Sequence, residues 1–209
     1  MKEKRSLILD IDGTLWDTRP LLARAWNGAI QKDGRSAARV TEESLRGLLG
    51  KTLAAIAREL FTDVDPEEVD EIMDLCLEAE HEALEADPCN LTYPGVPETI
   101  RAMAKERKLF IVSNCETGYV QLFLEKTGLA EEISDAEWFG RTGAPKGESI
   151  RLLMERNGLP TALYVGDTQG DLEATRYAGI PFVWASYGFG SPDTWDYKID
   201  SFSELKKLP

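Results

Sequence analysis

The stretch at residues 7–18 constrains the fold more than any other part of this sequence. Leu7-Ile8-Leu9 indicates a short buried strand, and the Asp-x-Asp-Gly-Thr that follows indicates a turn. Because side chains two positions apart on a strand point to the same side, Asp10 and Asp12 are expected to converge. Two such carboxylates repel each other unless a cation lies between them or one holds a proton. Turn formation and N-capping explain an isolated Asp-x-Asp equally well, so other parts of the chain must decide.

The composition is that of a soluble globular protein. The chain has 209 residues, enough for one core and an inserted subdomain, and 43% of them are hydrophobic and 29% charged. Its formal charge of -13 disfavours nucleic acid and anionic membranes as partners. The same charge disfavours a small anionic substrate unless the site supplies positive charge locally.

The expected location is the cytoplasm. The apolar run before Asp10 is too short for a signal-peptide core or a membrane span. Cys76, Cys89 and Cys115 are odd in number and lack the spacing of a metal site, which suits reduced thiols.

Two sequence patterns divide the chain. Residues 16–91 show only helical patterns, expected at 18–33, 42–49, 53–61 and 65–86. The last of these carries a run of acids, interpreted as a solvated helix face, and within it His81 is expected at the surface.

From residue 92 onward, strands and helices alternate. Strands are expected at 109–112, 136–139, 162–165 and 181–185, and helices at 99–107, 119–126, 146–157 and 171–178. This alternation predicts an α/β fold, a doubly wound parallel-sheet (Rossmann-like) core formed by 1–15 and 92–209. The all-helical segment 16–91 is then a subdomain inserted after the first strand.

In open parallel sheets, ligands bind at the carboxyl ends of the strands. Three strand ends carry polar residues here: Asp10 with Asp12, Ser113, and Asp167. Such a cluster of carboxylates without His or Cys suits Mg²⁺ rather than zinc.

Two further residues extend this expected site. Asp171 follows Asp167 closely, although a role as the N-cap of its helix is an equally good explanation. Lys146 begins a helix, where its charge opposes the helix dipole and a lysine is ordinarily a surface residue without a role. The position makes more sense if Lys146 turns inward and balances the acids, and this is what we expect.

Four motifs in order carry a resemblance to a known family. They are Asp10-Ile11-Asp12-Gly13-Thr14-Leu15 with Asp17-Thr18, then Ser113-Asn114, Lys146, and Gly166-Asp167-Thr168 with Asp171. In these motifs the chain resembles the haloacid dehalogenase superfamily, in particular the phosphatase branch that includes phosphoglycolate phosphatases and β-phosphoglucomutase. The resemblance implies Mg²⁺-dependent hydrolysis of a small phosphorylated metabolite, with segment 16–91 as a cap over the site.

The resemblance also implies a role for each matching residue. Asp10 would be the nucleophile that forms an aspartyl phosphate, and Asp12 the general acid and base. The metal would be held by Asp10, the main-chain carbonyl of Asp12 and Asp167, with Asp171 orienting its waters. Phosphoryl and substrate contacts would come from Thr14, Ser113, Lys146 and Asn114, and from Arg46 and Lys51 in a loop of the cap. A surface role explains Arg46 and Lys51 equally well.

Three alternatives remain open. A sugar mutase of this superfamily typically has a His where this chain has Leu22, which argues against that activity. A phospho-acceptor module of receiver type also gathers acids and a Lys around Mg²⁺, but usually in a shorter chain without a helical insert. A catalytically idle binding protein would be expected to lack some motif residue. The sequence indicates neither the physiological substrate nor the oligomeric state.

Overall fold

The structure, a computed structural model, describes residues 5–88 and 91–209. The chain forms two compact units by its internal contacts. The core unit is Met1–Asp17 with Asn90–Pro209, and the helical unit is Thr18–Cys89. Cys89 and the basic start of the chain, residues 1–4, lie outside the described residues.

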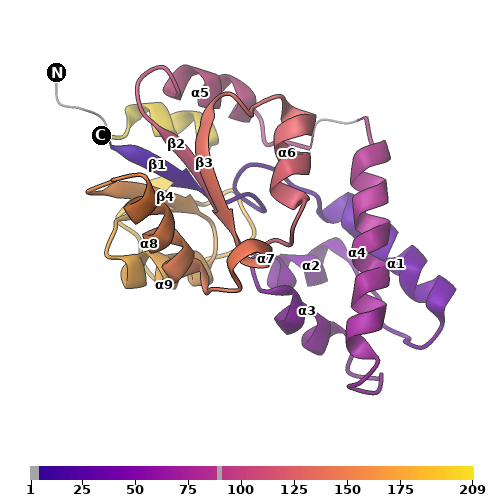
Figure 1. Cartoon of the computed structure of the whole chain (residues 1–209). Coiled ribbons are helices and arrows are strands. Elements are labelled where there is room, and N and C mark those ends of the chain that lie inside the picture. The colour runs from indigo at the N-terminus through magenta and orange to yellow at the C-terminus, as the bar shows by residue number, and fades with distance from the viewer. Residues whose placement is uncertain (1–4, 89–90) are drawn as a thin grey trace. The chain divides into compact units, whose positions relative to one another are not determined.

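The core unit is built on a parallel sheet of six strands in the order β3-β2-β1-β4-β5-β6 (Figure 1). The order reverses at β1, which pairs with β2 on one side and β4 on the other. In sheets of this kind the ligand site lies at the carboxyl ends of the strands near the reversal. The strands are β1 (Ser6–Leu9), β2 (Leu109–Ser113), β3 (Ile133–Trp138), β4 (Ala162–Gly166), β5 (Phe182–Ala185) and β6 (Tyr197–Ile199).

Helices cover both faces of this sheet, so β1, β2 and β4 are almost continuously apolar and buried. On one face, α8 (Lys146–Arg156) and α9 (Gln169–Ala178) pack on a cluster that includes Ile8, Phe110 and Tyr164. On the other side Figure 1 shows α5 (Val96–Met103) and α6 (Tyr119–Thr127). The short α7 (Phe139–Thr142) and the 3-10 helix η1 (Phe202–Lys207) complete the unit. The predicted doubly wound core is therefore confirmed.

The helical unit contains α1 (Arg19–Asp33), α2 (Glu42–Leu48), α3 (Leu53–Leu60) and α4 (Val69–Ala86). Buried residues of α1 and α4 form its interior, among them Leu22, Trp26 and Cys76. The indole N–H of Trp26 donates to Glu80 at 2.9 Å. This bond gives a partner to the Glu80 carboxylate, which lies on the buried side of α4. His81 is exposed and lies 3.3 Å from Glu85, as expected for a surface residue.

Several predicted boundaries were wrong. The helix expected at 65–86 begins at Val69, because residue Asp65 forms a turn and accepts the amide of Glu67. The helix expected at 99–107 is α5, which begins at Val96 after Gly95. The strand expected at 136–139 is β3, which begins at Ile133 and passes directly into α7 at Phe139. Strand β6 and η1 were not predicted at all.

Within the described residues, every helix is too short or too polar to cross a lipid bilayer.

Candidate active site

The turn after β1 fixes the first two acids. The Asp10 amide donates to the carbonyl oxygen of Val165 at 2.9 Å and so continues the pairing of β1 with β4. One residue further on, the carbonyl oxygen of Ile11 accepts the amide N–H of Leu15 at 2.8 Å, and this bond closes the chain into a tight loop. Asp10 is thereby held at the carboxyl end of the sheet and is buried, with 1% of its surface exposed.

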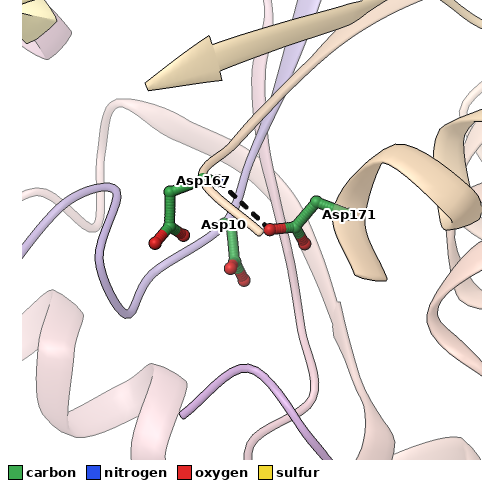
Figure 2. Close-up of side chains that lie close together, drawn as sticks. All are labelled: Asp10, Asp167 and Asp171. Carbon is green, nitrogen blue, oxygen red and sulfur yellow. Dashed lines mark hydrogen bonds between the residues drawn. The ribbon is translucent and has the colours of Figure 1, made fainter. Parts of the chain in front are cut away.

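Three buried carboxylates meet at this edge. Oxygen atoms of Asp10, Asp167 and Asp171 all lie within 4.8 Å of one another. Figure 2 shows Asp10 between the other two, with the amide of Asp167 donating to Asp171 Oδ2 at 3.1 Å. Strands β1 and β4 and the start of α9 bring these residues together, as the positions of Asp10 and Asp167 after strands predicted.

Lys146 supplies the positive charge within this group of acids. Its ammonium lies 2.7 Å from Asp171 Oδ1 and 3.1 Å from Asp10 Oδ1, and its side chain is only 5% exposed. Burial alone would lower the pKa of this amine, but the two carboxylates outweigh it and hold the pKa above its usual range. The sequence-based expectation that Lys146 turns inward is therefore correct.

Asp171 is saturated with hydrogen-bond donors. Its Oδ2 accepts the hydroxyl and amide of Thr168 at 2.7 and 3.0 Å, and its Oδ1 lies 3.3 Å from the hydroxyl oxygen of Tyr164. Although burial disfavours its charged form, the Lys146 ammonium and the two Thr168 donors lower the pKa of Asp171. The N-cap of α9 is Thr168, and Asp171 is the acid that completes its capping box, so the alternative that Asp171 is itself the N-cap is wrong.

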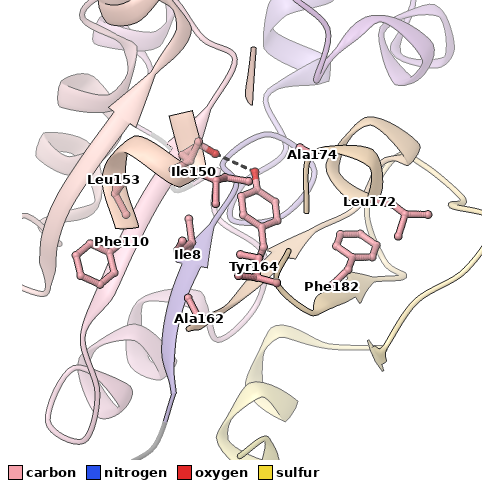
Figure 3. Close-up of a cluster of buried hydrophobic side chains, with 11 residues drawn as sticks. Ile8, Phe110, Ile150, Leu153, Ala162, Tyr164, Leu172, Ala174 and Phe182 are labelled. Carbon is pink, nitrogen blue, oxygen red and sulfur yellow. Dashed lines mark hydrogen bonds between the residues drawn. The ribbon is translucent and has the colours of Figure 1, made fainter. Parts of the chain in front are cut away.

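Tyr164 connects this acid to the hydrophobic core. Its ring belongs to the buried cluster under α8 and α9, and its hydroxyl donates to the carbonyl oxygen of Val112 at 2.9 Å (Figure 3). The hydroxyl thus lies between the end of β2 and Asp171. A rigid, well-packed ring therefore supports the position of a charged residue at the sheet edge.

Asp167 is enclosed by backbone. Its Oδ2 accepts the amide of Phe189 at 2.6 Å, and its Oδ1 lies 3.3 Å from the hydroxyl of Thr14. A Cβ on Gly13 (φ 77°) or on Gly188 would collide with its carboxylate, so both chain segments approach as closely as glycine allows. Burial, reinforced by the neighbouring Asp171, raises the pKa of Asp167 to about 7.

Asp10 is the least compensated of the three acids. Burial raises its pKa well above the usual value, Lys146 opposes this shift, and Asp171, Asp167 and Asp12 add to it. Its Oδ2 is buried and has no hydrogen-bond partner within the described residues. An orphaned carboxylate oxygen beside a second acid of raised pKa is the environment that a hard divalent cation relieves. The residues present therefore fit such a cation.

The Asp12 carboxylate is not part of the three-acid group. Its Oδ1 accepts the hydroxyl of Tyr119 at 2.6 Å and the indole N–H of Trp16 at 3.1 Å. Four residues were proposed from the sequence as metal ligands, and the carboxylates of three of them, Asp10, Asp167 and Asp171, form one cluster of oxygens. The fourth, Asp12, was expected to offer only its main-chain carbonyl.

The other predicted site residues are distributed over both units. Ser113 ends β2 and is buried, and Asn114 follows it. Arg46 lies on α2 rather than in a loop, which corrects that detail of the expectation, and it is exposed. Lys51 is also exposed and pairs with Glu59 at 2.6 Å.

Sequence patterns missed four contributors to this site: Trp16, Tyr119, Tyr164 and Phe189. Each of them contacts an acid through a single N–H or O–H group. Phe189 contributes only its amide, which no side-chain pattern reveals. For Trp16, the spacing of four residues from Asp12 within a turn was a usable signal, since such spacing brings two side chains together.

Comparison with known proteins gives the family. Residues 7–185 match the model of the haloacid dehalogenase-like hydrolase family. The phosphoglycolate phosphatase of Photobacterium profundum is 30% identical over 95% of this chain and 93% of its own. A phosphoglycolate phosphatase of Pseudomonas fluorescens is 28% identical over 98% of this chain and 78% of its own.

Solved structures agree at the level of the fold. A predicted phosphoglycolate phosphatase from Haemophilus somnus superposes with a TM-score of 0.83 at 24% identity, over 99% of this chain and 98% of that one. A haloacid dehalogenase-like hydrolase of Streptococcus pneumoniae gives 0.84 at 17% identity, over 99% of each chain. With a family match over most of its length, this chain belongs to the haloacid dehalogenase-like hydrolases and is an enzyme of the phosphatase type.

Proposed function

We propose that the chain is a Mg²⁺-dependent phosphatase that hydrolyses a small phosphate monoester through an aspartyl phosphate on Asp10. The observation that carries this proposal is the state of the Asp10 carboxylate. It is buried beside a buried lysine and two further acids, and one of its oxygens lacks a partner within the described residues. A nucleophile needs to be held in a fixed position, and burial of the Asp10 carboxylate against Lys146 holds it in one.

In the first step, an oxygen of Asp10 attacks phosphorus, and the bond from phosphorus to the ester oxygen breaks. The departing alkoxide takes a proton from Asp12, which acts as general acid. In the second step, water gives a proton to Asp12 and attacks the same phosphorus, and the bond to Asp10 breaks. Free phosphate leaves, and both carboxyl groups return to their starting states. General acid and base catalysis of this kind contributes roughly 10²- to 10⁴-fold.

Positive charge must offset four acids before an anion can approach. Lys146 is the built-in contribution, since its ammonium already contacts Asp10 and Asp171. Mg²⁺ held by Asp10, the main-chain carbonyl of Asp12 and Asp167, with Asp171 orienting its waters, would supply the remaining charge and polarise the phosphoryl oxygens. Thr14, Ser113, Asn114 and Lys146 are the proposed donors to those oxygens, at about 10²- to 10³-fold for one preorganised donor.

We propose 2-phosphoglycolate as the first substrate to test, because the curated relatives at 27–30% identity carry the name phosphoglycolate phosphatase. The net charge of -13 leaves nucleic acid an unfavourable partner. We also propose a cytoplasmic location, where small phosphorylated metabolites are found.

The test is phosphate release from a panel of small monoesters that includes 2-phosphoglycolate and an aryl phosphate. Activity should disappear in excess chelator, return with Mg²⁺, and be absent from Asp10→Asn under all conditions. Undiminished turnover in excess chelator would contradict the metal assignment. Activity on the aryl ester but not on 2-phosphoglycolate would keep the chemistry and reject that substrate.

A further inference from the structure

The carboxylate of Asp12 is anchored by two aromatic side chains. Tyr119 donates its hydroxyl to Asp12 Oδ1 at 2.6 Å, and Trp16 donates its indole N–H to the same oxygen at 3.1 Å. All three residues belong to the core unit. Hydrogen bonds from neutral donors to a carboxylate are among the stronger ones in proteins, and two on one oxygen restrict rotation of the group.

The two donors are themselves held rigidly. Trp16 is 1% exposed, and its ring makes edge-on contacts with Tyr119 and Phe123, at centroid distances of 5.4 and 5.0 Å. Tyr119 is the first residue of α6, directly after Gly118 with φ 97°. The path from β2 into α6 and the packing of the indole together fix where the phenol oxygen lies.

We propose that Tyr119 is a positioning residue, which acts with Trp16 to hold Asp12 in the orientation needed for proton transfer. The inference rests on the proposed role of Asp12 as general acid and base. With Oδ1 held by these two donors, the Asp12 carboxyl group gives a proton to the departing alkoxide and later takes one from water.

Positioning of this kind has a measurable consequence. A misplacement of about 1 Å at a reacting group can lower a rate roughly 10²-fold. An alkyl ester needs its leaving oxygen protonated, whereas an aryl ester with an acidic phenol does not. Loss of the Tyr119 hydroxyl should therefore affect the formation of the phosphoenzyme from alkyl esters far more than from such aryl esters.

The experiment compares Tyr119→Phe with the wild type on one alkyl and one activated aryl phosphate. Phenylalanine keeps the ring against Trp16 and removes only the hydroxyl. We expect kcat/KM for the alkyl ester to fall about tenfold or more, within the range of general acid catalysis, with kcat/KM for the aryl ester changed less than about threefold. Tyr177→Phe is the matched control, because it removes a hydroxyl from an exposed tyrosine on α9 and should change neither value.

A second arm uses Asp12→Asn. If Tyr119 acts through Asp12, adding Tyr119→Phe to this variant should not slow phosphorylation of Asp10 by the alkyl ester any further. Equal losses on both esters, additive effects with Asp12→Asn, or unchanged kinetics would each overturn the positioning role. Absence of any phosphatase activity in the wild type would instead reject the proposed function, so the two failures are distinguishable.

Discussion

Lys146 is the residue on which the charge balance of the site depends. Its ammonium contacts Asp10 and Asp171, and its side chain is buried. Removing one partner of a buried ion pair leaves a charge without compensation, which is more costly than never having buried the pair. The same amine is the one proposed to meet the phosphoryl group, so stability and catalysis depend on a single atom.

Lys146→Met should therefore lower both activity and stability. We expect the free energy of unfolding at neutral pH to fall by about 3 kcal/mol, measured by denaturant titration. Lys198→Met is the matched control, because Lys198 pairs with Asp200 at 2.7 Å on the surface, where a pair contributes at most about 1 kcal/mol. Similar losses in the two variants would contradict the charge-balance role of Lys146.

At the scale of elements, residues inside strands and helices were predictable and their ends were not. The runs at Leu7–Leu9, 109–112 and 162–165 are buried on both faces, so their apolar character alone identified β1, β2 and β4. Strand β6 has only three residues at the edge of the sheet and carries a weaker pattern. Helix α7 follows β3 without a loop, so no turn signal separates them.

The site was predictable to the extent that its residues follow strands. Asp10 and Asp167 come directly after β1 and β4, and the parallel sheet brings their ends together. The donors from Tyr119 and Phe189 were not predictable, because these residues reach Asp12 and Asp167 from distant segments of the chain. Their contacts depend on the exact path of loops, which sequence periodicity does not describe.

Two helices offer a matched test of how an element supports the site. Both α2 and α9 begin with a threonine capping box, at Thr41 and Thr168. Either Thr→Ala change should cost about 1 kcal/mol of stability. Only Thr168→Ala should also raise the Mg²⁺ concentration for half-maximal activity, by about tenfold, because its hydroxyl holds Asp171 at 2.7 Å. Equal metal dependence in the two variants would show that this contact serves the helix alone.

At the scale of the whole molecule, the residues proposed for catalysis and the residues proposed for substrate selection belong to different units of the chain. All of the acids discussed above as site residues, with Lys146, belong to the core unit, whereas Arg46 and Lys51 belong to the helical unit. In this division the core unit would perform the phosphoryl transfer to Asp10, and the helical unit would select the leaving group of the substrate. That selective role of Arg46 and Lys51 stays a prediction.

Arg46→Ala and Lys51→Ala should each raise KM for the proposed substrate, 2-phosphoglycolate, while a small aryl phosphate is turned over nearly as before. The reason is that selective residues contact the leaving group, and the aryl ester offers little to contact. Steady-state kinetics on both substrates measure this, with the exposed Arg58→Ala on α3 as control. Parallel losses on both substrates would indicate damage to the fold rather than lost selectivity.

The covalent intermediate on Asp10 is the central claim, and intact-protein mass spectrometry of Asp12→Ala tests it most directly. In this variant Asp10 can still attack an aryl ester whose leaving group needs no proton, but the water that should release the phosphate lacks its base. After incubation with Mg²⁺ and such an ester, we expect the protein to gain the mass of one phosphoryl group, located on Asp10 by peptide mapping. The added mass should be absent from the double variant with Asp10→Asn. A phosphoryl group on any other residue, or near-normal turnover by Asp10→Asn, would contradict the mechanism.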